Sequence, residues 1–356
     1  MNAALALRVL VLPVLASALL GLLGPVVARR CGHSALVRVL PVTCLLVATS
    51  TVVGGATLAV SALAGVDDVA ELGRWSTRAL PTAWRTLPAG VGVIAGLLVA
   101  GLLAAVVRRA SALLAQLFAA GRVCRSADRA GGGVVVVSDA RPHAFAVAGL
   151  PGRVVVSTGM LAVLDEPGQR ALVAHERSHL HRRHHLSLIA VQLAAAADPL
   201  LRPLVAVTAH AVEREADEDA ARVVGDRRAV GVAIARAGLA TAAADRANHQ
   251  PVRPTALPAA TAGDVPRRVA ALLAPPVPPR RLGAAVLLAF ALLTVWPSAL
   301  SGLATDHHID HARAAYRPSD AERPDGTARR QPAGVTPAHP RGPLPAGQAG
   351  SGLTGR

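Results

Sequence analysis

Two histidines and a glutamate lie close together near the middle of the sequence, in the stretch Ala171-Leu-Val-Ala-His175-Glu176-Arg-Ser-His179. On a helix, residues four apart share a face, so the imidazoles of His175 and His179 can bind one metal ion. Glu176 can then reach the water molecule that the metal activates. This H-E-x-x-H pattern is typical of zinc metallopeptidases, but so short a string also arises by chance and needs support from elsewhere in the chain.

A run of acidic residues that begins at Glu213 offers such support. Glu213 and Asp217 are four apart and share one face of a helix that we expect over residues 206–224, ended by Gly225. Glu213 is the candidate third metal ligand, and Asp217 the candidate partner for the free ring nitrogen of a ligand histidine. The alternative is a solvated acidic face, but interspersed apolar residues indicate a half-buried helix.

Together these side chains match what zinc hydrolysis requires. A catalytic zinc needs three protein ligands and an open position, and His175, His179 and Glu213 supply the ligands for one Zn²⁺ per chain. Glu176 is the candidate general base: it takes a proton from the activated water and passes it to the leaving amine.

The helix that carries the histidines is expected to begin near Asp165, where acidic residues and a proline mark a helix start, and to run to about His184. His181 and His185 are also four apart and give an alternative register. Arg182 stands where the reaction needs a glutamate, so we assign this pair to a basic, membrane-proximal end of the helix.

Composition indicates a membrane protein. Mean hydropathy is +0.43, and 52% of residues are hydrophobic while only 2% are aromatic. The formal charge of +15 comes from arginines at the ends of apolar runs, which positive-inside flanks explain better than nucleic-acid binding. Three scattered cysteines indicate neither a disulfide framework nor a cysteine-based zinc site.

Four apolar runs long enough to cross a bilayer divide the chain, at residues 5–27, 39–64, 91–107 and 281–303. A signal peptide is the alternative for the first run, but its apolar core would be shorter, and the strongest positive charge here follows the run. Residues 186–197 are also apolar but too short to span, and predict a buried or interfacial helix.

The arginines predict the orientation in the cell membrane. We expect a multi-pass protein whose first three helices lie within residues 1–110, with the N-terminus and loop 65–90 outside. Residues 111–280 then form a cytoplasmic metallopeptidase domain. Residues 304–356, rich in Pro, Gly and Arg, are expected to be a disordered extracytoplasmic tail.

Three short strand-like runs precede the H-E-x-x-H stretch, at residues 134–138, 143–148 and 153–157. They predict a small sheet beside the metal-binding helix. An edge strand there can bind an extended peptide through its backbone. The candidate substrate-binding strand is His143, Ala144, Phe145 and Ala146.

Four stretches in combination, His143-Ala-Phe-Ala, Val154-Val-Val-Ser-Thr-Gly-Met-Leu, His175-Glu-Arg-Ser-His and Glu213-Arg-Glu-Ala-Asp, resemble membrane metallopeptidases of the BlaR/MecR family. They also resemble the related HtpX and CAAX prenyl protease family. The resemblance implies a gluzincin-type zinc endopeptidase in the cytoplasm, with the two histidines and the first glutamate of E-x-x-A-D binding zinc. The expected fold class is a mainly α integral membrane protein with about four transmembrane helices and an α+β zinc peptidase domain carrying a small sheet.

Antibiotic-sensing members of that family carry a folded penicillin-binding domain after the last helix, where this sequence has the Pro/Gly/Arg-rich tail, so we expect no β-lactam sensor. The leading hypothesis is a membrane-embedded endopeptidase acting on a protein or peptide, either a repressor or a membrane protein, in signalling or protein quality control. The alternative is a non-catalytic membrane signalling or scaffold protein that keeps the fold. The expected partners are the substrate and membrane lipids, without nucleic acid.

Overall fold

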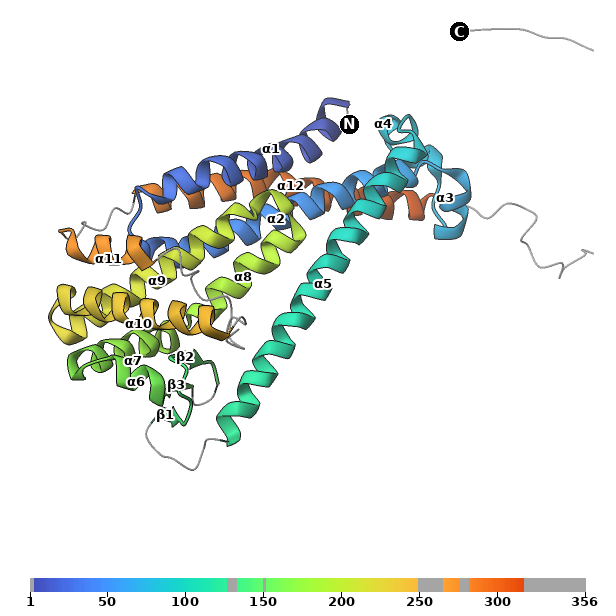
Figure 1. Cartoon of the computed structure of the whole chain (residues 1–356). Coiled ribbons are helices and arrows are strands. Elements are labelled where there is room, and N and C mark those ends of the chain that lie inside the picture. The colour runs from blue at the N-terminus through green and yellow to red at the C-terminus, as the bar shows by residue number, and fades with distance from the viewer. Residues whose placement is uncertain (1–2, 127–132, 150–151, 249–264, 276–281, 317–356) are drawn as a thin grey trace, which may run out of the picture. The chain divides into compact units, whose positions relative to one another are not determined.

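A computed structural model describes residues 3–126, 133–149, 152–248, 265–275 and 282–316. The described chain is mainly helical and carries one small three-stranded sheet (Figure 1). The helices before the sheet are α1 (Ala3–Ala28), α2 (His33–Leu63), α3 (Asp67–Gly73), the 3₁₀ turn η1 (Thr77–Ala79), α4 (Thr82–Arg85) and α5 (Ala89–Ser126). The strands are β1 (Val134–Val137), β2 (Ala144–Val147) and β3 (Arg153–Ser157). The later helices are α6 (Thr158–Val163), α7 (Glu166–His181), α8 (His184–Ala197), η3 (Pro199–Leu201), α9 (Pro203–Val224), α10 (Arg227–Asn248), α11 (Val265–Leu273) and α12 (Leu282–Ala314).

Four helices are long and apolar enough to cross a membrane: α1, α2, α5 and α12. By length and composition they are the candidate membrane spans that the four apolar runs predicted. Each of these helices extends beyond its apolar run at one or both ends. In particular, α5 continues past residue 107 to Ser126, because the helical pattern persists after the arginine pair at 108 and 109.

The helices α8 and α9 form a hairpin that packs among the candidate spans (Figure 1). One apolar core joins residues of α1, α2, α8, α9 and α12, with Leu40, Val191 and Leu204 among its fully buried members. At the tip of the hairpin, Asp198 accepts hydrogen bonds from Ser17 of α1 and Thr51 of α2. The stretch that was expected to be a buried or interfacial helix forms α8, one face of which is buried.

A second apolar core joins the sheet to α6, α7, α9, α10 and α11. The helix α9 contributes to both cores: Leu204 and Val212 belong to the first, and Ala220 belongs to the second. Its acidic segment, which starts at Glu213, lies between the two. The helix ends at Val224, as expected, because Gly225 adopts a left-handed backbone with φ 78°.

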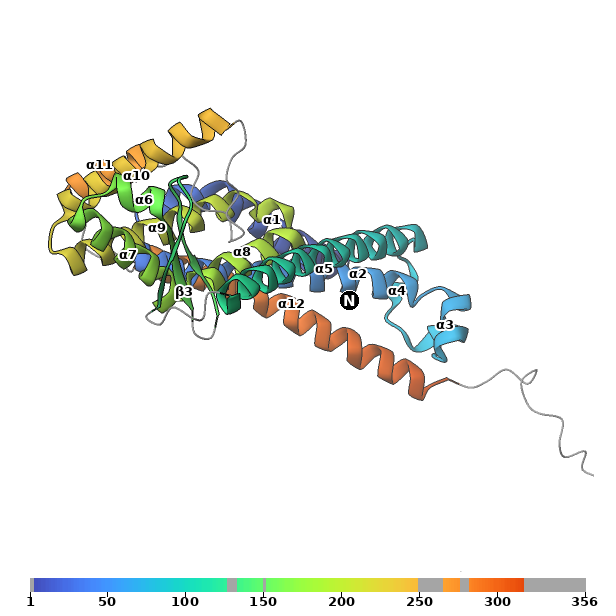
Figure 2. The same ribbon diagram turned by 60° about the horizontal axis from the view of Figure 1, so that its bottom comes forward.

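The sheet has the strand order β1-β3-β2, with β1 parallel and β2 antiparallel to β3. The strand β2 therefore lies at an edge. The helix α7 contacts β2 and β3, and α5 also contacts β2. Figure 2 shows α7 beside the sheet. The register pairs Phe145 with Val155 and Val147 with Arg153. This arrangement brings the expected substrate-binding strand beside the helix that carries the histidines.

Two expected boundaries were wrong. The helix α7 ends at His181 instead of continuing to about His184, because Arg183 adopts a left-handed backbone with φ 53° and the chain turns into α8. The last helix continues to Ala314, so the first residues of the expected disordered tail are helical. Trp84 of α4 packs with Ile309 there and stabilises the extra turns. The rest of the expected tail, 317–356, and the arginines at 280 and 281 lie outside the described residues.

Candidate metal centre

The H-E-x-x-H residues lie on α7, whose start and burial follow from its sequence. The side chain of Asp165 accepts a hydrogen bond from the backbone of Gly168 at 3.0 Å and caps the helix, while Pro167 occupies the first turn. The buried face of α7 consists of Gly168, Ala171, His175 and Ser178, which recur at helical spacing. His175 is therefore directed inward, toward α9.

The structure brings together the three expected metal ligands, His175, His179 and Glu213. One potential ligand atom from each lies within 4.8 Å of the others, and this is the one such group found among the described residues. The two Nε2 atoms of the histidines are 3.2 Å apart. The Glu213 carboxylate lies 3.4 Å from Nε2 of His175 and 3.7 Å from Nε2 of His179.

Asp217 lies behind His175, where it was expected. Its carboxylate is fully buried, and Oδ1 lies 3.0 Å from Nδ1 of His175, the ring nitrogen that faces away from Glu213. A carboxylate in this position fixes the tautomer and orientation of a metal-ligating imidazole.

Arg268 of α11 completes the cluster and was not predicted from the sequence. It donates two hydrogen bonds to Asp217, at 2.9 Å from Nε and 2.6 Å from Nη2, and its Nη1 lies 2.9 Å from Glu213. The guanidinium thus contacts both carboxylates, and its two hydrogen bonds to Asp217 have the bidentate geometry that arginine favours. Its signal in the sequence is weak, because Arg268 is one of 37 basic residues and lies 51 positions after Asp217.

Charges in the cluster shift the pKa values of its members. Burial disfavours a charged His175, but the nearby carboxylates of Asp217 and Glu213 outweigh burial and raise its pKa to about 10. Burial lowers the pKa of His179 to about 3, so this imidazole is neutral. Burial also opposes ionisation of Glu213, but His175 and Arg268 lower its pKa to about 2. Without a metal, His175 is therefore protonated, while His179 is neutral and Glu213 is ionised.

This arrangement fits a divalent cation. Two imidazole nitrogens that face each other at 3.2 Å share either a hydrogen atom, donated by one ring and accepted by the other, or a metal ion that both bind. Two histidines with one carboxylate form a donor set of catalytic zinc sites, which leaves a fourth position open. His175, His179 and Glu213 would hold the ion, and Asp217 and Arg268 would hold the ligands in place.

Glu176 lies between the cluster and the sheet. The residue as a whole is partly exposed, while its carboxyl group lies inward and accepts a hydrogen bond from the backbone N–H of Ala146 in β2. Burial raises the pKa of its carboxyl above the usual range, which suits a group that must accept and then release a proton.

The strand β2 presents part of its backbone at the open edge. Ser157 donates a backbone hydrogen bond to His143, so in an antiparallel pair the alternate residues Phe145 and Val147 bond to β3. Ala144 and Ala146 then direct their N–H and C=O groups outward. The rings of His143 and Phe145 stack with their centroids 6.0 Å apart on the same side of the strand.

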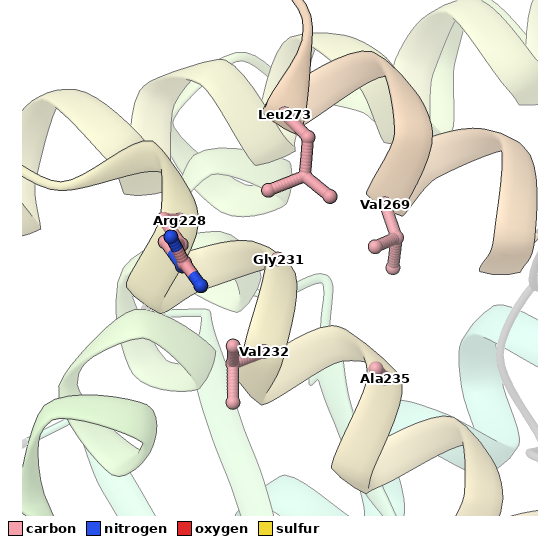
Figure 3. A pocket seen from close by; sticks show the side chains of 6 residues that line it. All are labelled: Arg228, Gly231, Val232, Ala235, Val269 and Leu273. Atoms are coloured by element: carbon pink, nitrogen blue, oxygen red, sulfur yellow. The ribbon is translucent and has the colours of Figure 1, made fainter.

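A surface pocket of about 360 Å³ between α10 and α11 lies outside this cluster (Figure 3). Its lining residues are mostly apolar: Arg228, Gly231, Val232, Ala235, Val269 and Leu273. None of them is a metal ligand, an acid or a nucleophile, so the chemistry belongs to the metal cluster.

Comparison with known proteins agrees with this geometry. The model of peptidase family M48 matches residues 114–221, a segment that contains α7 and the acidic part of α9. The match covers less than half of the chain and supports a metallopeptidase of this family, whose members depend on a metal. It does not distinguish the BlaR/MecR-type group. Searches of curated proteins and of solved structures found no significant match.

Proposed function

We propose that this chain is a membrane-embedded, zinc-dependent endopeptidase of the kind that the BlaR/MecR and HtpX resemblance implies. The observation that carries the proposal is the convergence of two imidazoles and a carboxylate beside a glutamate that contacts an open strand edge. A metal cluster alone would suit a structural site, but structural zinc sites are closed by four protein ligands.

In the proposed reaction, the metal, Glu176 and the backbone of β2 have separate roles. When bound, zinc polarises the carbonyl of the scissile bond and lowers the pKa of a water molecule toward neutrality. Glu176 accepts a proton from that water and returns it to the leaving nitrogen, so proton transfer begins and ends on one carboxylate. The N–H and C=O groups of Ala144 and the C=O group of Ala146 pair with an extended substrate and align its backbone.

The position of the site favours a substrate cleaved close to the membrane. The ring centroid of His33, in the first turn of α2, is 6.5 Å from that of His210, about one turn before Glu213 on α9. The candidate metal site therefore lies beside the end of a candidate span, near the arginine-rich and proposed cytoplasmic side. We propose that the substrate is a membrane protein, cleaved in a segment next to its own membrane helix, and not a freely soluble repressor.

A comparison of cleaved membrane proteins in cells with the wild-type chain and with Glu176→Gln tests this function. The expected result is a set of fragments that the variant lacks, with new termini near cytoplasmic membrane boundaries. Identical fragment patterns in both strains, with both chains folded and in the membrane, would favour a non-catalytic scaffold. New termini far from any membrane helix would contradict the proposed substrate class alone.

A further inference from the structure

His179 has a second neighbour that its role as a metal ligand does not explain. Its Nε2 faces the other ligands, while its Nδ1 lies 3.0 Å from Nδ1 of His184, the first residue of α8. His184 is 1% exposed, and its own Nε2 lies 3.1 Å from Oε2 of Glu215, which is 4% exposed. The half-buried His179 and the buried His184 and Glu215 thus form a continuous line from a candidate metal ligand to a carboxylate.

One assignment of protons satisfies the whole line. If Nε2 of His179 binds a metal, its hydrogen is on Nδ1 and is donated to Nδ1 of His184. His184 then carries its own hydrogen on Nε2 and donates it to Glu215. Each imidazole is neutral and has one donor and one acceptor in use, so no buried polar atom of the line is left without a partner.

We propose that His184 and Glu215 are positioning residues that fix the tautomer and orientation of His179 as a metal ligand. The inference rests on the metal site of the proposed function. Asp217 supports His175 directly, whereas Glu215 supports His179 through an intervening imidazole. Each supporting carboxylate is in turn paired with an arginine: Arg268 with Asp217, as above, and Arg182 with Glu215 at 3.0 Å.

The backbone between α7 and α8 is arranged to place His184 there. Arg183 adopts a left-handed conformation, with φ 53° and ψ 42°, which is unfavourable for a residue other than glycine. This turn ends α7 and begins α8 within two residues, and it places His184 beside His179. Strain of this kind persists where the surrounding contacts stabilise it.

The line of His179, His184 and Glu215, called the relay below, also contacts α2, a candidate membrane helix. Glu215 accepts a hydrogen bond from the side chain of Ser34, in the first turn of α2. Ser187, one turn after His184, donates to the backbone carbonyl of Val37 at 3.1 Å. The position of α2 therefore helps to set the position of Glu215, and through His184 that of the metal ligand.

Zinc affinity of the full chain in detergent, measured by competition with a chromophoric chelator, tests the relay. His184→Leu removes the acceptor and is expected to weaken zinc binding roughly 10- to 100-fold. His184→Asn places an acceptor oxygen where Nδ1 lies and is expected to recover most of that loss, which a packing role alone would not produce. His185→Leu, on the same helix, is the matched control and should bind zinc like the wild type.

Glu215→Gln keeps the shape of the carboxylate, removes its charge, and is expected to weaken zinc binding less than His184→Leu. Because the two residues act in series, the double variant should bind no more weakly than His184→Leu alone. Wild-type affinity in His184→Leu, or an Asn variant no better than the Leu variant, would overturn the relay. Should His184→Leu not fold, unchanged affinity in Glu215→Gln overturns it instead. A wild-type chain that binds no zinc would refute the proposed function itself.

Discussion

Replacement of Arg268 by leucine should destabilise the metal-free protein far more than a typical surface substitution. Arg268 donates two hydrogen bonds to Asp217, whose carboxylate is fully buried. Removal of one partner from a buried ion pair costs roughly 3–5 kcal/mol. Asp217 would retain His175 at 3.0 Å and Arg214 at 3.7 Å, so we expect a loss near the lower end of that range.

The assay is the free energy of unfolding by denaturant titration in detergent micelles, with a chelator and with saturating zinc. The loss should be smaller with zinc, because the cation takes over part of the neutralisation of Glu213, which lies 2.9 Å from Arg268. Arg267→Leu is the control, since Arg267 is an exposed neighbour on α11. Arg268→Lys keeps the charge without the bidentate geometry and should be intermediate. Equal losses for the Arg268→Leu and Arg267→Leu variants in chelator would refute the reasoning.

Three further outcomes follow from the site and its surroundings. Asp217→Asn should weaken zinc affinity roughly 10- to 100-fold, because the tautomer of His175 is no longer fixed by a charged acceptor; chelator competition measures this, and an unchanged affinity would contradict it. Ala144→Pro removes an outward N–H at the edge of β2 and should lower kcat/KM several-fold through about 1 kcal/mol of lost substrate pairing, whereas Phe145→Pro removes an inward N–H and should lower stability instead. A topology reporter fused at Gly131 should report the cytoplasm, and an extracytoplasmic signal there would reverse the proposed orientation.

The sequence alone predicted the local part of the site. His175 with His179, and Glu213 with Asp217, are pairs four residues apart, and helical geometry places each pair on one face without any knowledge of the fold. The apolar runs likewise predicted four helices of spanning length, because length and composition are properties of the segment itself.

The parts that depend on distant contacts were not predictable in this way. Arg268 and His184 join the cluster through the packing of α11 and through the left-handed turn at Arg183, and neither leaves a periodic pattern in the sequence. The end of α12 was misplaced for a similar reason. Ile309 and its neighbours were assigned to a polar tail, because the sequence does not show that Trp84 of α4, far away in the chain, packs against them.

The most direct test of the central claim combines zinc content with proteolysis on the same purified preparations. The account predicts about one zinc per chain in the wild type and in Glu176→Gln, because Glu176 is not a ligand. It also predicts that the wild type hydrolyses a membrane-protein substrate in liposomes, and that Glu176→Gln does so more slowly by a factor of about 10² to 10⁴. Undiminished hydrolysis by Glu176→Gln, with zinc bound and the fold intact, would contradict the assignment of Glu176 as the general base and with it the proposed mechanism.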